Sequence, residues 1–174
     1  LETSLKAYGK AQIDAFGFSF TATAYLPDVD QDARLAAMSE KVGYPIISSS
    51  QAIHRALQRL GATRLALFSP YPSWLTELSA THWSAKGYEV VSVASMPVDT
   101  SDTVNIYGLR TKSMLEASKA LETEQADAIV VTGSGMATLP AVAALTARTG
   151  KPFLCSNICL AWALLDKLGL THLA

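Results

Sequence analysis

The chain has 174 residues, of which 49% are hydrophobic, and its formal net charge is -1 at pH 7. These values predict one compact domain with a sizeable core. The sequence contains no cluster of Lys and Arg, which argues against a nucleic acid or an anionic membrane surface as a partner. The apolar runs are too short to cross a membrane, and two cysteines, Cys155 and Cys159, do not make a disulfide framework, so we expect a cytoplasmic protein.

Helical patterns and short apolar runs alternate along the chain. In chain order, we expect helices over residues 1–12, 31–42, 51–60, 73–87, 111–124, 139–149 and up to 168, and strands over 15–20, 46–47, 63–69, 88–96, 128–131 and 153–154. Asp28 or Asp30 caps the helix that begins at residue 31, and residues 21–24 form a loop. Residues 97–110 form the longest loop, and loops of such length are often functional.

This alternation predicts an α/β fold in which helices cover parallel sheets. The strand at 88–96 alternates polar and apolar residues, so we expect it near a sheet edge. Ligands of such folds bind beyond the carboxyl ends of the strands. The segments at those ends are Phe20-Thr21, Ser69-Pro70-Tyr71 and Gly133-Ser134-Gly135, and we expect a site where they meet.

The chain also contains an internal repeat of roughly fifty residues. Asp14-Ala15 matches Asp127-Ala128, and Phe20-Thr21-Ala22 matches Gly133-Ser134-Gly135. The further matches are Gly-x-Pro at 43–45 and 150–152, a polar cap at 48–50 and 155–157, and Leu-Gly at 60–61 and 168–169. We therefore expect one domain, 1–174, with two pseudo-symmetric lobes and a site between them: a first lobe of about 13–62 with the C-terminal helix, and a second of about 63–155. Chance likeness between two strand–helix units is the alternative.

The turn Gly133-Ser134-Gly135 connects a buried strand to a helix, so its backbone N–H groups are suited to bind an anion. A nucleotide cofactor is disfavoured, because Thr138 stands where a third glycine is needed and no acidic residue ends the following strand. A small carboxylate is the better anion. A plain strand-to-helix turn without a ligand is the alternative.

Other reactive side chains have competing structural explanations. Tyr71, between two prolines past a strand end, is suited to donate to a bound oxyanion, and a tyrosine packed at a turn is the alternative. Cys155 and Cys159 lie in an apolar helix and are expected to be buried, although Cys155, at the helix start, is the better candidate nucleophile. His54 and His82 lie on helices away from strand ends, so we expect structural roles. No spacing predicts a metal site, and we expect no cofactor.

Two strand–turn–helix units facing one site resemble the Asp/Glu racemase superfamily, and within it the arylmalonate decarboxylase and maleate isomerase branch. The resemblance is carried by Phe20-Thr21-Ala22-Thr23, Ser69-Pro70-Tyr71, the segment GSGMATL at 133–139 and the two Gly-x-Pro stops with their polar caps. It covers almost the whole chain. Members usually carry a further N-terminal strand, so the resemblance implies a segment ahead of Leu1.

In that superfamily a cysteine at the head of one or both loops acts at the carbon next to a carboxylate. By resemblance, these two positions are Phe20 and Gly133, so both thiols are replaced and the catalytic residue is unknown. Racemisation needs a proton donor and acceptor, and neither residue can serve. Decarboxylation remains feasible if one carboxylate is held while the other enters an apolar pocket.

The carboxylate-binding part of the resemblance survives better. It implies that Thr21, Tyr71 and the backbone N–H groups of Ser134 and Gly135 hold a carboxylate or an enediolate. Ala22 belongs to the same substrate-binding set, but it stands where a hydroxyl residue is common, so one donor is lost.

We therefore expect an enzyme that acts on a small carboxylic or dicarboxylic acid, such as a substituted malonate or maleate, as a decarboxylase, isomerase or racemase without the usual cysteines. The alternative is a catalytically degenerate member that binds a small carboxylate or a protein partner. A nucleotide-binding module is a third class, which predicts thermal stabilisation by nucleotides but not by dicarboxylates. The substrate, the stereochemistry and a homo-oligomeric state are left open.

Overall fold

The computed structural model describes residues 2–8, 11–96 and 103–173. Its α-helices are α1 (Glu2–Ala7), α2 (Gln31–Val42), α3 (Ser49–Leu60), α4 (Ser73–Ala85), α5 (Thr111–Ala117), α6 (Leu139–Thr149) and α7 (Ser156–Lys167). Its strands are β1 (Phe16–Phe18), β2 (Ile46–Ser48), β3 (Arg64–Ser69), β4 (Glu89–Ser95), β5 (Ala128–Val131) and β6 (Phe153–Cys155). Short 3-10 helices are η1 (Thr21–Tyr25), η2 (Thr103–Gly108), η3 (Ser118–Ala120) and η4 (Thr171–Leu173).

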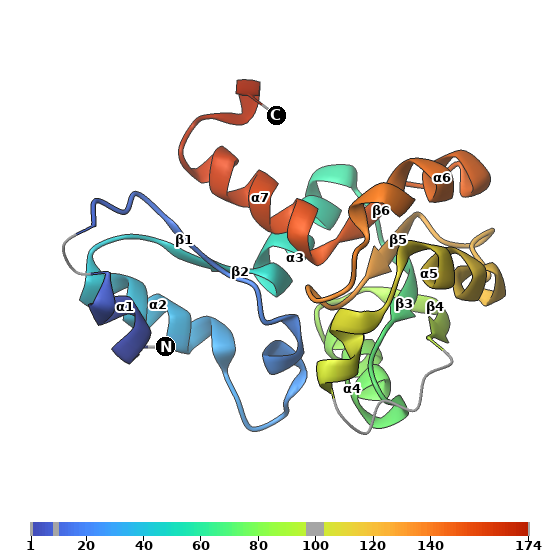
Figure 1. The fold of residues 1–174 in the computed structure, drawn as a ribbon, viewed down its shortest axis with the longest axis horizontal. Helices are drawn as coiled ribbons and strands as arrows, with labels where there is room; N and C mark the ends of the chain where they lie inside the picture. The colour runs from blue at the N-terminus through green and yellow to red at the C-terminus, as the bar shows by residue number, and fades with distance from the viewer. Residues whose placement is uncertain (1, 9–10, 97–102, 174) are drawn as a thin grey trace.

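The strands form two parallel sheets. β1 pairs with β2, and the larger sheet has the order β4-β3-β5-β6. Helices α3 and α7 pack against each other and contact strands of both sheets, so they lie between the sheets, as Figure 1 shows. The predicted α/β fold with helix-covered parallel sheets is confirmed, and β4 is an edge strand as expected.

Local sequence signals explain where the elements begin and end. All residues of β5 are buried, as expected for the apolar run Ala-Ile-Val-Val. A capping box starts α3: the N–H of Gln51 donates to Ser48 Oγ (3.1 Å), and the N–H of Ser48 donates to Gln51 Oε1 (3.0 Å). Helices α2 and α6 end at Gly43 and Gly150, whose φ angles of 81° and 67° favour glycine.

The register of the strands matches the sequence repeat. Phe18 in β1 lies opposite Ser48 in β2, and Val131 in β5 lies opposite Cys155 in β6. The repeat pairs the same positions, because Phe18 corresponds to Val131 and Ser48 to Cys155. The two units are therefore built alike, as strand, helix, strand and helix. The boundaries of the two lobes stay a prediction.

Three predicted elements differ in the structure. Helix α1 ends at Ala7 rather than at residue 12, before Gly9, a residue type that disfavours helix. The expected loop at 21–24 is the 3-10 helix η1, in which the Thr23 hydroxyl donates to the Phe20 carbonyl oxygen (2.8 Å) and accepts from Gln31 Nε2. Local side-chain hydrogen bonds thus order this segment.

The third difference is the helix expected over 111–124, because α5 ends at Ala117 and η3 follows. Here Arg148 of α6 donates hydrogen bonds to the carbonyl oxygen and the hydroxyl oxygen of Ser118 (3.1 and 3.0 Å). A contact with α6 thus binds the carbonyl oxygen at the end of α5, where η3 begins. Asp30, not Asp28, caps α2. In the long loop, residues 103–108 form η2, and residues 97–102 lie outside the described ones.

The core is divided between the two sheets. The larger cluster surrounds β3 and β5 and includes Phe68 and Trp83, and the smaller one joins Leu5, Leu35 and Ile46 beneath β1 and β2. Within the residues that the structure describes, no helix combines the length and the apolar character needed to span a membrane.

Candidate functional site

A small cavity lies at the carboxyl ends of the strands, where segments from both halves of the chain meet. Its volume is about 90 Å³. Its lining comes from η1 and the residue before it, from the turn after β3, from η2 and from the turn after β5: Phe20, Thr21, Ala22, Tyr71, Ile106, Tyr107, Gly133, Ser134 and Gly135. All the residues expected to bind a substrate, and both positions expected for the family cysteines, thus line one cavity, which we call the candidate site.

The buried hydroxyl of Thr21 links the candidate site to α7. Thr21 Oγ1 donates a hydrogen bond of 2.9 Å to Oγ of Ser156, the first residue of α7. The Tyr71 hydroxyl also interacts with Thr21. Hydroxyl hydrogens rotate, so either Thr21 or Tyr71 can turn its proton toward a ligand oxygen.

Tyr71 lies deep in the candidate site, with only 6% of its surface exposed. Burial raises the pKa of its phenol well above the usual 10, and nearby Tyr107 acts in the same direction, whereas the hydrogen bond with Thr21 opposes the shift. The ring also meets Tyr25 edge-on, with 6.4 Å between centroids. Tyr71 therefore stays protonated at neutral pH and can act as a hydrogen-bond donor.

Two glycines let the turn after β5 pack closely against its neighbours. Gly133 has a φ angle of 86°, and a Cβ atom there would lie 2.8 Å from Cγ of Pro70 and 3.3 Å from the Tyr71 hydroxyl oxygen. A Cβ atom at Gly135 would lie 2.9 Å from a ring carbon of Tyr107. Side chains at either position would displace the walls of the candidate site.

The same turn presents free backbone donors. The N–H groups of Ser134 and Gly135 have no acceptor among the described residues. Asn157 Nδ2 donates a hydrogen bond of 3.0 Å to the Ser134 carbonyl oxygen and so fixes the turn. Helix α6 begins at Leu139, as predicted, so the turn at 133–135 ends before the first residue of the helix. An anion would therefore be bound by the turn amides rather than by the α6 N-terminus.

The two cysteines do not line the candidate site. Cys155 and Cys159 are both buried and unpaired, and burial raises the pKa of Cys159 to about 12, with Cys155 adding to the shift. Cys155 borders a different and larger groove of about 510 Å³ between α6 and α7. The larger volume does not make this groove the better candidate site, because its lining is mostly apolar and holds none of the expected binding residues.

The histidines expected to be structural also lie away from the candidate site. His54 Nδ1 is 2.8 Å from the Tyr88 hydroxyl oxygen, and His82 Nε2 is 2.9 Å from Ser50 Oγ. Burial, assisted by the charge of Lys86, lowers the pKa of His82 to about 4. Among the described residues, no three His, Cys, Asp or Glu side chains gather in a way that could hold a metal ion.

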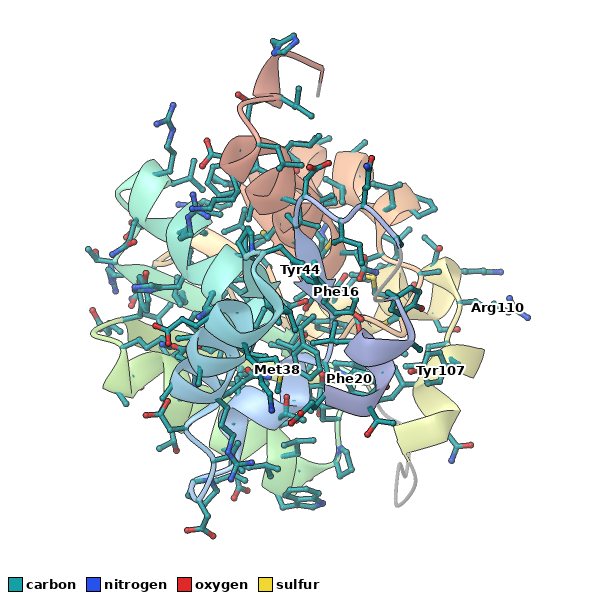
Figure 2. The ribbon with its side chains drawn as sticks, turned by 90° about the vertical axis from the view of Figure 1, so that its left-hand side faces the viewer. Phe16, Phe20, Met38, Tyr44, Tyr107 and Arg110 are labelled. Atoms are coloured by element: carbon teal, nitrogen blue, oxygen red, sulfur yellow. The ribbon has the colours of Figure 1, made fainter. Side chains whose placement is uncertain are left out.

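The site includes two residues that the sequence did not single out as ligand-binding. Ile106 and Tyr107, on η2, form one wall, and Tyr107 remains 67% exposed at the rim. Figure 2 shows Phe20 and Tyr107 on different elements, with Arg110 pointing outward. The length of the loop at 97–110 was the only signal of this wall, since nothing in its sequence shows that it folds over the turn at Gly135.

Comparison with known proteins identifies the family of this chain. The family model described as arylmalonate decarboxylase matches residues 3–174. The chain belongs to the arylmalonate decarboxylase family. This confirms the resemblance found in the sequence.

Maleate isomerases are also similar to this member of the arylmalonate decarboxylase family. The enzyme of Geobacillus stearothermophilus is 30% identical over 142 residues, which cover 80% of this chain and 56% of that protein. The maleate isomerase of Pseudomonas putida S16, solved with maleate, has a TM-score of 0.88 at 23% identity over 97% of this chain and 70% of that one. A cysteine-to-serine variant of the Nocardia farcinica enzyme, solved with a covalently bound succinylcysteine intermediate, has a TM-score of 0.86 at 22% identity over 97% and 71% of the chains.

These matches differ in what they establish. At 22% and 23% identity the solved structures show a common fold alone. The chain also spans about half the length of the curated maleate isomerases it matches, 51% and 56% for two of them. The family is thus established.

Proposed function

We propose that this chain belongs to an enzyme that acts on a small carboxylic or dicarboxylic acid, as a decarboxylase or an isomerase. The observation that carries the proposal is the candidate site, which collects Thr21, Tyr71 and the free N–H groups of Ser134 and Gly135 around one cavity. The names of the relatives, maleate isomerase and arylmalonate decarboxylase, support the same substrate class. The unpaired cysteines support a cytoplasmic location.

The size and polarity of the candidate site favour a small acid over a nucleotide. Its volume of about 90 Å³ is well below the range of about 300–1,000 Å³ that is usual for sites of drug-sized ligands. The described residues that line it include no Lys, Arg or His. A carboxylate would therefore be held by neutral donors, namely hydroxyl and backbone N–H groups.

In the proposed reaction the site stabilises charge rather than supplying a nucleophile. When the carbon between two carboxylates loses one of them as CO₂, the electron pair of the broken C–C bond moves onto the remaining carboxylate as an enediolate, and a proton from solvent then converts this enediolate to the product acid. The Tyr71 hydroxyl and the turn amides of Ser134 and Gly135 are fixed before the reaction, so they stabilise this charge without reorganisation. The aromatic rim of Phe20 and Tyr107 would surround a departing carboxylate with apolar surface.

A second candidate function is a catalytically degenerate protein that binds a small carboxylate or a protein partner. It is favoured by the lining of the candidate site, whose described residues include no thiol, imidazole or carboxyl group. The raised pKa of Tyr71 makes this phenol a poor base at neutral pH. An isomerase or racemase needs such a group more than a decarboxylase does.

The two functions can be separated by proton NMR in D₂O. The protein, made from its natural start, is incubated with substituted malonates, maleate, aspartate, glutamate and hydantoins. Decarboxylation, isomerisation and exchange of the α proton each give a distinct spectral change. We expect turnover of a malonate or of maleate, and a silent panel with folded protein would favour the degenerate alternative.

A binding experiment tests the candidate site itself. The test variant is the double substitution Tyr71→Phe with Thr21→Ala. It should need at least a tenfold higher concentration of the bound acid to reach the same rise in melting temperature as the unsubstituted protein. The matched control is Tyr8→Phe with Thr81→Ala, because both of these residues are exposed and lie outside the site. If the two double variants bind the acid equally, the carboxylate is held elsewhere. Stabilisation by nucleotides instead of acids would support the nucleotide-binding class.

A further inference from the structure

A second cavity gathers basic side chains that are far apart in the sequence. Its volume is about 330 Å³, and its lining comes from α2, β2 and the residue before it, α3, the residue after α4 and the last residue of α7. The polar residues that line it are Asp32, Gln51, His54, Arg55, Lys86 and Lys167. It shares no residue with the candidate site, so the two are separate, and we call this one the basic cavity.

Positive charge exceeds negative charge in the basic cavity. Arg55, Lys86 and Lys167 are cationic, and among the described residues of the lining Asp32 alone is acidic. Lys86 Nζ donates to Asp32 Oδ2 (3.2 Å), and Arg55 is paired with Asp166, which is not part of the lining. Lys167 has no ion-pair partner among the described residues. One cation is therefore left without a counter-charge even when both ion pairs are formed.

Two neutral side chains add hydrogen-bond donors. The Tyr88 hydroxyl oxygen lies 2.8 Å from His54 Nδ1. Burial raises the pKa of Tyr88, and burial together with the charge of Lys86 lowers the pKa of His54, so at neutral pH both groups are uncharged and the phenol donates to Nδ1. The ring proton of His54 then lies on Nε2, which has no partner in the described part of the chain. Gln51 accepts the N–H of Ser48 at Oε1, so its Nε2 group is also available.

The donors of the basic cavity come from different elements. Gln51 and His54 lie on α3, Lys86 follows α4, and Lys167 ends α7. A carboxylate offers two oxygens in one plane, whereas a phosphate group offers three that point in different directions. Lysine binds phosphate as a point charge and needs no planar partner. The arrangement therefore suits a phosphate group better than a single carboxylate.

The basic cavity also has room for more than a phosphate group. Its volume of about 330 Å³ lies at the lower end of the range of about 300–1,000 Å³ that is usual for sites of small molecules. Pro45 and Ile47, at the start of β2, add apolar surface to the lining. Such a surface can pack against the organic part of a small ligand.

We propose that the basic cavity binds a small phosphate monoester, with Lys86, Lys167 and His54 Nε2 at the phosphate oxygens and Pro45 and Ile47 beside the organic part. Asp32 limits the affinity, because it neutralises Lys86. The cations stand at positions 55, 86 and 167, so the fold rather than the local sequence brings them together. The inference does not depend on the proposed function.

Proton NMR of the histidine rings tests the binding. Glycerol 3-phosphate, inorganic phosphate and citrate are titrated into the protein at pH 7.5 and constant ionic strength, with sodium chloride as the reference salt. The Cε1 proton signal of His54 should shift and saturate with glycerol 3-phosphate, whereas that of His172, which is exposed on η4, should not. Equal shifts of the two histidines would overturn the proposal. Saturation by inorganic phosphate alone, or tighter binding of citrate, would overturn the monoester and assign the cavity to the free ion or to a polycarboxylate.

A pair of double variants locates the phosphate. Lys86→Gln with Lys167→Gln should raise the Kd for glycerol 3-phosphate at least about tenfold. The control Lys41→Gln with Lys112→Gln removes the same charge and also one ion pair, because Lys41 is paired with Glu2, and both lysines are exposed and lie outside the basic cavity. Equal weakening by the two double variants would show a general attraction to positive charge and would overturn the site.

A variant that should bind more tightly guards against effects of misfolding. Asp32→Asn frees Lys86 and should lower the Kd about two- to fivefold, whereas Glu122→Gln, at an exposed acid before β5, should not. Unchanged or weaker binding by Asp32→Asn would contradict the proposal. Tyr71→Phe with Thr21→Ala should leave the titration unchanged, because these residues line the candidate site and not the basic cavity. Failure of one site is thus distinguishable from failure of the other.

Discussion

Thr21 Oγ1 donates to Ser156 Oγ at 2.9 Å, although 135 positions separate the two residues in the chain. Both side chains are buried, but only Thr21 lines the candidate site. The start of α7 thus orients a hydroxyl that we propose to bind substrate. A residue that touches no ligand can therefore affect binding through its partner.

Ser156→Ala should remove this hydrogen bond and leave the Thr21 hydroxyl without its buried acceptor. We expect a loss of about 1 kcal/mol in the free energy of unfolding, together with weaker binding of the carboxylate. Urea titration measures the first effect and ligand-induced thermal shifts the second. Ser84→Ala, on the exposed side of α4, is the control. Unchanged ligand affinity in Ser156→Ala would mean that Thr21 needs no support from α7.

Gly133→Ala should destabilise the protein even though alanine is a small residue. The φ angle of 86° disfavours any side chain, and the new Cβ would lie 2.8 Å from the ring of Pro70. We expect a cost of about 1–3 kcal/mol in the urea-derived free energy of unfolding. Gly108→Ala is the matched control, because its Cβ meets no atom within 4 Å and its φ is not positive. If both variants are equally stable, position 133 does have room for a side chain, and the prediction is wrong.

The two cysteines should react slowly with thiol reagents in the native protein. Both side chains are buried, which keeps the reagent away from them, and burial raises the pKa of Cys159 to about 12, so little of the Cys159 thiolate is present at pH 8. We expect labelling by a disulfide reagent to be at least tenfold faster in urea than in buffer. Ser84→Cys, at an exposed position, provides a rapidly reacting reference. If Cys155 were labelled rapidly in the folded protein, this result would contradict the prediction and make Cys155 a candidate nucleophile again.

Stability should fall when the pH is lowered from about 6.5 toward 4. Burial, with Lys86 nearby, lowers the pKa of His82 in the folded protein to about 4, whereas a histidine in an unfolded chain titrates near 6.5. The unfolded state therefore binds the proton first as the pH falls, and unfolding becomes easier. Burial also lowers the pKa of His54, which acts in the same direction.

Urea titrations at pH 7.5 and 5 measure this dependence. His82→Gln should reduce the difference between the two pH values, and His172→Gln, at an exposed position on η4, should leave it unchanged. Equal stability of the unsubstituted protein at both pH values would contradict the prediction.

Much of the architecture could be predicted from short sequence patterns. The apolar run at 128–131 and the Gly-x-Pro stops indicate strands and helix ends, because burial and positive φ angles restrict which residues fit. In the sequence, Asp14 corresponds to Asp127 and Phe20 to Gly133, and this correspondence indicated the repeat. The register of β1 with β2 and of β5 with β6 matches it. The expected binding residues were found by their position after strands, since parallel strands end at one edge.

The sequence by itself therefore determined the order of the elements, the parallel sheets and the residues at their carboxyl ends. The tertiary structure alone decided that η2 brings Ile106 and Tyr107 to the candidate site, that Ser156 orients Thr21, and that α5 stops where Arg148 binds Ser118. The physical reason is range: periodicity and turn chemistry act between near neighbours in the chain, whereas these contacts depend on how sheets and helices pack across many residues.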